Sequence, residues 1–207
     1  PESKGSGTII SSDGHILTNY HVVKGSYTVL VRILDDKSYK GVVVGFDESL
    51  DIAVIKISDS GFPFVEPSQV WVIVGDELVI IGYPESYDLL GPPSLTKGIV
   101  SAYRFVDGYN YIQTDAALNS GVSGGAAFTS DGQYIGIPTW KLRDTENMGF
   151  LIPLLEIVDV LPELIDGKRS IIKATPRPRP SVTPRPRPTP IPTPIPTATP
   201  TPVKFKT

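Results

Sequence analysis

The sequence of 207 residues predicts an all-β domain, either a sandwich or a pair of barrels, followed by a proline-rich tail. Three observations support this fold class. Short β-rich runs recur at close spacing over residues 5–166, Asp-Gly turns such as Asp13-Gly14 separate several of them, and helical periodicity is almost absent. The composition then changes abruptly near Lys173. We therefore expect a folded domain over residues 1–168 and a separate segment over residues 169–207.

Eleven runs have the length and the β-branched or aromatic content that strands require. In chain order, the expected strands are Gly7–Ile10, Ile16–Thr18, Tyr27–Leu34, Ser38–Phe46, Ile52–Ile57, Glu77–Ile81, Gly98–Tyr103, Tyr111–Thr114, Gly124–Phe128, Tyr134–Thr139 and Gly149–Ile152. Only Leu154–Ile165 has helical spacing, with its apolar residues on one stripe. Pro162 should end or kink that helix, because proline lacks the N–H that a helix interior needs.

The segment from Thr175 to Pro202 contains 12 of the 21 prolines, in alternation with threonine, arginine and isoleucine. Proline fixes φ and biases the preceding residue toward extended conformations, so we expect a disordered or polyproline II tail. A spacer is one interpretation. Docking to a receptor for proline-rich peptides, or to an anionic polymer through the arginines, is the alternative.

Charge and composition exclude several function classes. Residues 1–166 carry 22 acidic and 10 basic residues, a net charge of −12 that would repel nucleic acid. The absence of cysteine excludes a cysteine nucleophile and thiolate metal sites, and two histidines, His15 and His21, argue against a multi-histidine metal site. The sequence shows no apolar run long enough for a membrane span and no visible signal peptide. We expect no cofactor and no metal.

The string Gly121-Val122-Ser123-Gly124-Gly125 contains the Gly-x-Ser-x-Gly pattern that unrelated serine hydrolases share. In an α/β-hydrolase the acid and the histidine follow the serine, and here no histidine follows Ser123. The subtilisin order needs an acid before the histidine, and Asp13 stands in a turn only eight residues before His21, an awkward spacing. The chymotrypsin order of His21, Asp51 and Ser123 fits the sequence best.

Each of these three residue types supplies one part of nucleophilic catalysis. The imidazole of His21 would accept the proton of Ser123, and the carboxylate of Asp51 would fix the imidazole tautomer. Backbone N–H groups of the turn at Gly121, Val122 and Ser123 would hold the developing oxyanion, with Gly121 and Ser123 as its two donors. A turn serine, a partly buried histidine and a strand-opening aspartate are the ordinary alternatives. Their joint occurrence in a permitted order favours catalysis.

Further motifs extend over about residues 5–165 in a consistent order. They are Gly5-Ser6-Gly7-Thr8, Leu17-Thr18-Asn19-Tyr20-His21, Asp51-Ile52-Ala53-Val54, Ile81-Gly82-Tyr83-Pro84, Thr96-Lys97-Gly98-Ile99, Gln113-Thr114-Asp115-Ala116 and Gly149-Phe150-Leu151-Ile152-Pro153. Together with the serine turn, they resemble the protease domain of the HtrA/Deg family of trypsin-like serine proteases.

The resemblance implies two six-stranded antiparallel β-barrels with a closing C-terminal helix and a triad in the cleft between the barrels. It implies a serine endopeptidase that cleaves peptide bonds in unfolded or extended protein segments without a metal or cofactor. It also implies a place outside the cytoplasm, in the periplasm, in the cell envelope or among secreted proteins. Relatives of this type trimerise, so a trimer is one expected oligomeric state.

The resemblance also places a substrate pocket and shows where this chain departs from the family. The expected pocket residues are Ala117, Leu118, Ile137, Pro138, Thr139 and Phe150. Ala117 stands where trypsins carry an acid, so we expect a small to medium apolar side chain at P1. Val122 replaces a usual asparagine, Pro138 cannot donate to a substrate strand, and no PDZ domain follows in the sequence. These departures keep a second interpretation open, a catalytically weak homologue that binds or senses ligands on a proline-rich stalk.

Overall fold

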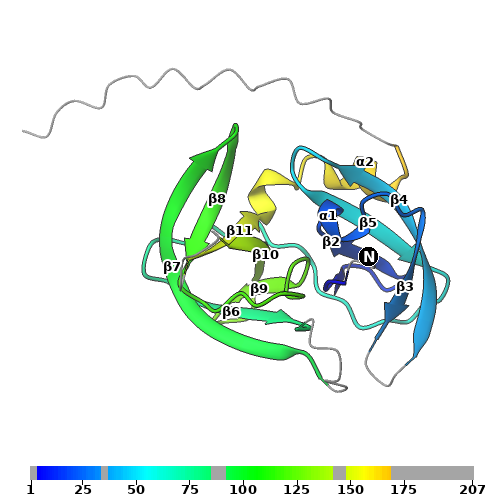
Figure 1. The fold of residues 1–207 in the computed structure, drawn as a ribbon, viewed down its shortest axis with the longest axis horizontal. Helices are drawn as coiled ribbons and strands as arrows, with labels where there is room; N and C mark the ends of the chain where they lie inside the picture. Colours follow the sequence, from blue (N-terminus) through cyan, green and yellow to red (C-terminus); the bar gives the residue numbers. More distant parts are fainter. Residues whose placement is uncertain (1–3, 34–36, 85–91, 142–147, 169–207) are drawn as a thin grey trace, which may run out of the picture. The chain divides into compact units, whose positions relative to one another are not determined.

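The computed structural model describes residues 4–33, 37–84, 92–141 and 148–168. The chain divides into two units, residues 1–177 and 178–207, and every described element lies in the first unit (Figure 1). The expected tail over residues 169–207 lies outside the described residues. No helix within the described part is long and apolar enough to cross a membrane.

A strand occupies each of the eleven positions that the sequence predicts. The strands are β1 (Thr8–Ile9), β2 (His15–Thr18), β3 (Thr28–Arg32), β4 (Ser38–Asp47), β5 (Ile52–Ile57), β6 (Glu77–Gly82), β7 (Ser94–Val106), β8 (Tyr109–Thr114), β9 (Ala126–Thr129), β10 (Tyr134–Lys141) and β11 (Gly149–Pro153). The largest difference is in β7, which is 13 residues long. It forms a hairpin with β8 through the turn at Asp107-Gly108, where both residues have positive φ.

The first five strands form one antiparallel sheet, in the order β1-β2-β5-β4-β3. Side chains of its strands, among them Ile16, Val43 and Ile55, pack into a core of their own, which Phe62 of the following loop joins. The expectation of six strands in this half is wrong, since the described residues contribute five.

The other six strands form a closed barrel, in the order β10-β11-β8-β7-β6-β9. Closure follows from β9, which pairs with β6 on one side and with β10 on the other. Leu78, Val100, Ile112 and Leu151 belong to the core of this barrel and are fully or almost fully buried. This half therefore has the six antiparallel strands that were expected.

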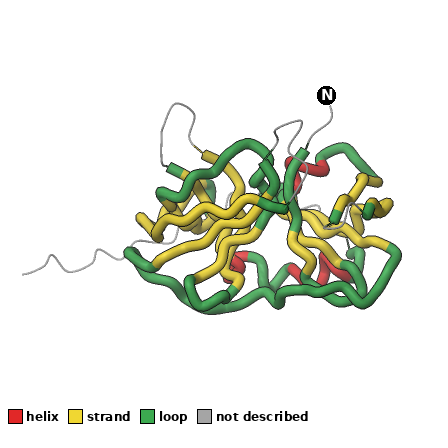
Figure 2. The backbone as a smooth tube through the Cα atoms, turned by 90° about the horizontal axis from the view of Figure 1, so that it is seen from below, coloured by secondary structure: helices red, strands yellow, loops and turns green. Residues whose placement is uncertain are grey.

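A third core cluster joins the two sheets. It contains Leu17 and Val54 from the first sheet, and Ile137 and Ile152 from the barrel, all almost completely buried. Burial of large apolar side chains is the main favourable contribution to folding, at about 1.5–3 kcal/mol for each side chain. Figure 2 shows the two groups of strands and the loops that connect them. Because the cluster draws on both sheets, residues at their junction are held in fixed positions.

Three short helices accompany the sheets in the part of the chain that the structure describes (Figure 1). They are α1 (Tyr20–Val23), the 3-10 helix η2 (Leu154–Glu156) and α2 (Leu161–Ile165). The prediction of one helix over Leu154–Ile165 is wrong in its continuity, because residues 157–160 between η2 and α2 form turns. Pro162 lies in the first turn of α2, where a missing N–H costs no hydrogen bond, and so it begins a helix instead of ending one.

Candidate active site

His21 and Asp51 meet at the edge of the first sheet. His21 lies on α1, and its Nδ1 is 2.8 Å from Oδ2 of Asp51. The backbone N–H of His21 donates to the other carboxylate oxygen, Oδ1, at 2.9 Å. The side chain of Asp51 is 27% exposed and that of His21 is 47% exposed. The carboxylate thus fixes the ring from one side and leaves the opposite ring nitrogen accessible.

The turn between β4 and β5 presents Asp51 in a constrained conformation. The Oδ1 atom of Asp47 accepts hydrogen bonds from the N–H groups of Ser49 and Leu50, at 2.8 and 3.1 Å, which builds the turn. Asp51 itself has a φ of +54°, a region that aspartate tolerates better than most residues. Its carbonyl accepts from the side-chain amide of Asn19 at 2.9 Å. Backbone strain of this kind is concentrated at functional sites.

Ser123 joins the same hydrogen-bond network through Thr139 of β10. The hydroxyl of Ser123 donates to the carbonyl of Thr139 at 2.8 Å. The hydroxyl of Thr139 donates to Oδ2 of Asp51, also at 2.8 Å. Within the described residues, the hydroxyl of Ser123 makes no hydrogen bond to His21. The structure therefore brings the three residues to one place, with Thr139 as the link between Asp51 and the serine.

The turn that carries Ser123 leaves two backbone donors free. Gly121 and Gly124 have φ angles of +93° and +85°, in the region that favours glycine. A Cβ atom at Gly124 would overlap the carbonyl oxygen of Ser6 and the hydroxyl of Thr18. Among the described residues, the N–H groups of Gly121 and Ser123 have no acceptor. Backbone N–H groups that have no acceptor in the protein are what an oxyanion site requires.

Val122 is excluded as a third donor. Its N–H donates to the carbonyl of Asn119 at 3.1 Å, which corrects the expectation that it faces an oxyanion. Its side chain is 4% exposed and packs into the barrel core. The replacement of a polar residue at this position therefore places an apolar side chain in an apolar environment.

Restoring the family residue at this position should weaken the fold. We expect Val122→Asn to lower the free energy of unfolding by about 1–3 kcal/mol, because the amide would be buried without polar partners. Urea unfolding of the variant and the wild type measures the difference. The matched control is Val70→Asn, since Val70 is 43% exposed and should change stability little. Equal stability of Val122→Asn and wild type would contradict the apolar packing of this turn.

The expected pocket residues divide into two groups. Ala117 is exposed and Leu118 is half-buried, so both can contact a ligand. Ile137, Pro138 and Phe150 are buried, and Ile137 belongs to the cluster that joins the sheets. The prediction that Ile137 lines a pocket is therefore wrong, because alternation along β10 directs its side chain into the core. Thr139 is also buried, and its hydroxyl contacts Asp51 rather than an open pocket.

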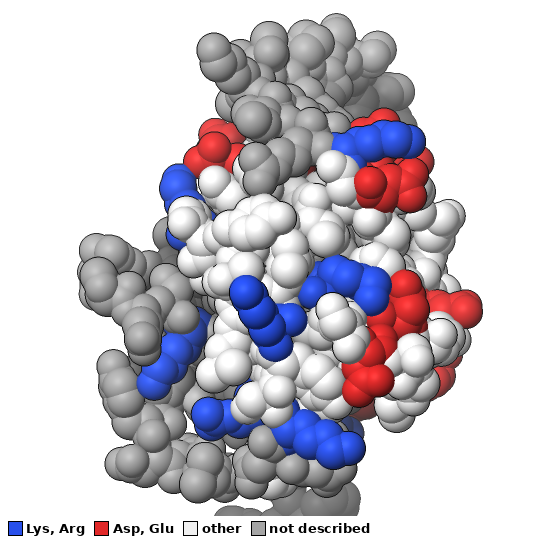
Figure 3. Space-filling model, turned by 90° about the vertical axis from the view of Figure 1, so that its right-hand side faces the viewer, with Lys and Arg blue, Asp and Glu red and all other residues white. Residues whose placement is uncertain are grey.

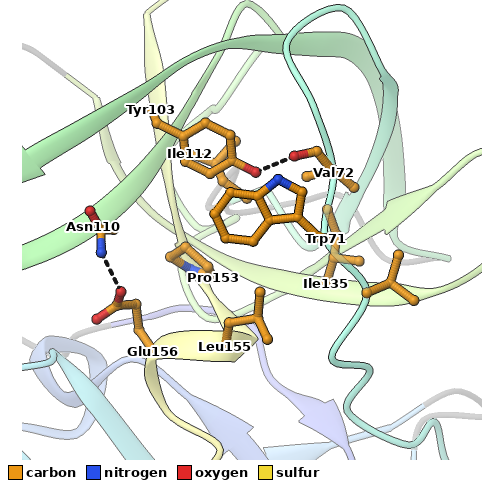
Figure 4. Close-up of a pocket in the computed structure, with 10 residues that line it drawn as sticks. Trp71, Val72, Tyr103, Asn110, Ile112, Ile135, Pro153, Leu155 and Glu156 are labelled. Carbon is orange, nitrogen blue, oxygen red and sulfur yellow. Dashed lines mark hydrogen bonds between the residues drawn. The ribbon is translucent and has the colours of Figure 1, made fainter. Parts of the chain in front are cut away.

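A separate cavity of about 280 Å³ opens beside the barrel (Figure 4). Trp71 stacks on Tyr103 at one side, and Asn110 donates to Glu156 at the other, with Pro153 between them (Figure 4). Burial raises the pKa of the Tyr103 hydroxyl, and the negative charge of Asp76 raises it further. His21, Asp51 and Ser123 do not line this cavity, so it is distinct from the network described above.

Charges on the surface carry both signs. On the face that Figure 3 shows, lysine and arginine side chains lie among uncharged residues and acidic ones lie beside them. Glu48 raises the pKa of Lys24, which lies close to His21 in sequence, through a hydrogen bond and through its negative charge.

In the part of the chain that the structure describes, no three histidine or acidic residues form a group that could hold a metal ion.

Comparison with known proteins identifies the family. Residues 5–137 match the profile of the trypsin-like peptidase domain, and this is more than half of the chain. The chain belongs to the trypsin-like peptidase family.

Curated relatives of this trypsin-like peptidase chain include serine proteases of the HtrA and DegP type. The chain is 38% identical over 162 residues to a putative serine protease HhoB of Synechocystis sp. The aligned region covers 74% of this chain and 38% of the relative. The chain is also 38% identical over 173 residues to a probable periplasmic serine endoprotease, DegP-like, of Hahella chejuensis, with 80% of this chain and 36% of the relative covered. The chain thus spans a little over a third of the length of these relatives.

Solved structures of the same type superpose on the chain. The HtrA-type protease AlgW with a decapeptide gives a TM-score of 0.72 at 32% identity, covering 80% of this chain and 52% of that one. The serine endoprotease from Yersinia pestis gives a TM-score of 0.70 at 34% identity, covering 78% of this chain and 57% of that one. These likenesses confirm the HtrA-type resemblance and a mostly β, trypsin-like fold with two antiparallel sheets.

From the sequence, no role in the site was assigned to several polar residues of this trypsin-like peptidase chain that hold the turns at Asp51 and Ser123 in place. The side chains of Asn19 and Asp47 hold the Asp51 turn, and Ser6 contacts the serine turn. All three are buried. A polar residue inside a β-rich, mostly apolar segment is the signal that could have found them, since buried polar groups are normally hydrogen-bonded.

Proposed function

We propose that the chain is a serine endopeptidase domain with His21, Asp51 and Ser123 as its catalytic triad. The observation that carries this proposal is the hydrogen-bond network in which His21 and Thr139 both contact Asp51, and Thr139 contacts Ser123. It joins residues from both sheets at one place, in the chain order of a trypsin-like enzyme. The N–H groups of Gly121 and Ser123, which have no acceptor among the described residues, lie in the same turn and can bind the carbonyl oxygen of a substrate.

The reaction would proceed by acyl transfer. The hydroxyl of Ser123 rotates away from the Thr139 carbonyl and passes its proton to Nε2 of His21 as its oxygen attacks the peptide carbonyl. The N–H groups of Gly121 and Ser123 bind the oxyanion of the tetrahedral intermediate. His21 then donates the proton to the leaving amine, and water hydrolyses the acyl-enzyme by the same steps. No step needs a cofactor or a metal.

The proposed substrates are unfolded or extended polypeptide segments outside the cytoplasm. Similar proteins supply part of this proposal, since one relative is a probable periplasmic serine endoprotease and the structure of AlgW contains a decapeptide. Exposed Ala117 and half-buried Leu118, which carry no charge, support a small to medium apolar P1 side chain. We propose that residues 1–168 form the protease domain and that the segment over 169–207 is a spacer.

One observation favours a second candidate, a catalytically weak homologue that binds ligands. The hydroxyl of Ser123 donates to Thr139 and not to His21, so the serine is not aligned with its base in this structure. A rotation about χ1 of one side chain separates the two arrangements, and its barrier is small beside that of the chemical step. The endopeptidase is therefore the conclusion that the geometry supports best.

Digestion of an unfolded protein tests both candidates at once. Reduced casein is incubated with the chain, and the ends of the products are mapped by mass spectrometry. The proposal expects cleavage with alanine, valine or leucine enriched on the carboxyl side of the cut. Intact casein, with the chain folded by circular dichroism, would favour the binding homologue, and cleavage after basic residues would contradict the pocket assignment.

A further inference from the structure

Ser6 makes an unusual number of contacts for a residue that precedes a short edge strand. Its N–H donates to the carbonyl of Ser123 at 2.8 Å, and its hydroxyl donates to the carbonyl of Gly121 at 2.7 Å. The same hydroxyl accepts from the N–H of Tyr83 at 2.7 Å, and its carbonyl accepts from the hydroxyl of Thr18 at 2.6 Å. Ser6 is 6% exposed, so water does not compete freely for these bonds.

These contacts hold both ends of the turn Gly121–Ser123. The carbonyls of Gly121 and Ser123 both accept from Ser6, and the carbonyl between them, that of Val122, accepts from the N–H of Gly125 at 2.9 Å. All three turn carbonyls are therefore held by donors from the protein. The N–H groups of Gly121 and Ser123 are left without acceptors among the described residues, as an oxyanion site requires.

The hydroxyl of Ser6 has its main effect on the backbone conformation at Gly121, to whose carbonyl it donates. Glycine has no Cβ and moves easily between backbone conformations, so its own φ of +93° does not hold the carbonyl in place. The side-chain bond from Ser6 fixes the orientation of the Gly121 carbonyl, and Tyr83 of the barrel in turn fixes the hydroxyl. Without the hydroxyl, only the bond from the N–H of Val122 to Asn119 holds the peptide group that follows Gly121, so the turn can rotate more easily and withdraw the N–H donor of Gly121.

We propose that Ser6 is a positioning residue that preorganises the oxyanion site through Gly121 and Ser123, and this rests on the proposed peptidase function. Ser6 does not touch the reacting atoms. It acts through the turn, so its loss affects the charged transition state more than the bound substrate. A side-chain substitution leaves the backbone bond from Ser6 to Ser123 in place, and it removes the bond to Gly121 together with the bond from the N–H of Tyr83.

The test compares Ser6→Ala with wild type in the hydrolysis of fluorescein-labelled casein and in labelling by a fluorophosphonate probe. We expect kcat and the labelling rate to fall about tenfold to a hundredfold, below the loss for a direct oxyanion donor, while KM stays within about twofold. Ser6→Cys keeps the volume and a weaker donor, so it should give an intermediate rate. It also serves if Ser6→Ala fails to fold.

Ser11→Ala is the matched control. The hydroxyl of Ser11, in the β1–β2 hairpin, donates to Asp13 at 2.6 Å, accepts from the N–H of His15 at 3.0 Å and contacts Nδ1 of His15 at 3.0 Å. It lies outside the site, so kcat should stay at the wild-type value. Equal rates for Ser6→Ala and wild type, or equal losses in both alanine variants, would overturn the proposal.

A measurement without turnover separates this inference from the proposed function. In ¹⁵N-labelled Ser6→Ala, the amide resonances of Gly121 and Ser123 should broaden or shift, since the turn would exchange between conformations on the μs–ms timescale. They should be unchanged in Ser11→Ala. Unchanged resonances in Ser6→Ala would refute the positioning role, whereas a wild type that neither cleaves casein nor reacts with the probe would refute the peptidase function alone.

Discussion

Replacing Ser123 by alanine is expected to lower kcat for casein hydrolysis by a factor on the order of 10⁵–10⁶ and to abolish fluorophosphonate labelling. Alanine removes the only atom that forms the acyl-enzyme. It leaves the free N–H groups of Gly121 and Ser123 in place, so the residual rate should exceed that of the uncatalysed reaction. Labelling followed by gel fluorescence, and steady-state hydrolysis, measure the two effects.

The fold should tolerate this change. Ser123 donates one hydrogen bond, to a carbonyl that is part of a strand, and its loss should cost about 0.5–1.5 kcal/mol. Ser68→Ala is a suitable control, because its hydroxyl accepts from the N–H of Val70 in an exposed loop. Labelling that persists in Ser123→Ala would show that another hydroxyl is the nucleophile, and the triad would have to be abandoned.

The chain order of three residue types was enough to predict which residues the structure brings together. Both histidines precede an acid and the serine, and His15 directly follows the turn glycine Gly14, which left His21 as the base; only Ser123 lay in a glycine-rich turn of the right form. The strand positions could also be predicted from the sequence, because short β-branched runs between turns have few other interpretations. Both inferences depend on local sequence.

Features that depend on packing between distant segments could not be predicted from the sequence. The assignment of Ile137 to the pocket failed because its side chain is buried in the cluster that joins the two sheets, just after an irregularity in the pairing of β10 with β9 between Tyr134 and Gly136. Helical spacing alone does not report the break between η2 and α2, where η2 contacts β10 and α2 contacts β4. The contacts of Ser6 join positions 115 and 77 residues apart, and no local pattern predicts them.

Replacing Asp51 by asparagine is expected to lower kcat on the order of 10⁴-fold with little effect on KM. The carboxylate accepts at Oδ1 from the backbone N–H of His21, and at Oδ2 it contacts Nδ1 of His21 and the hydroxyl of Thr139. The backbone N–H is a fixed donor, so the oxygen of an asparagine must face it. The amide NH₂ then faces the imidazole ring and the Thr139 hydroxyl, which can both turn to accept.

The consequence is the wrong tautomer of His21. An imidazole that accepts at Nδ1 carries its proton on Nε2, and such a ring cannot take the proton of Ser123. Steady-state hydrolysis measures the loss, and ¹⁵N chemical shifts of the His21 ring report the tautomer directly. Asp59→Asn is the control, because this carboxylate, which follows β5, accepts from Tyr39 at 3.2 Å. A loss below about tenfold, or an unchanged tautomer, would mean that Asp51 positions α1 without serving the base.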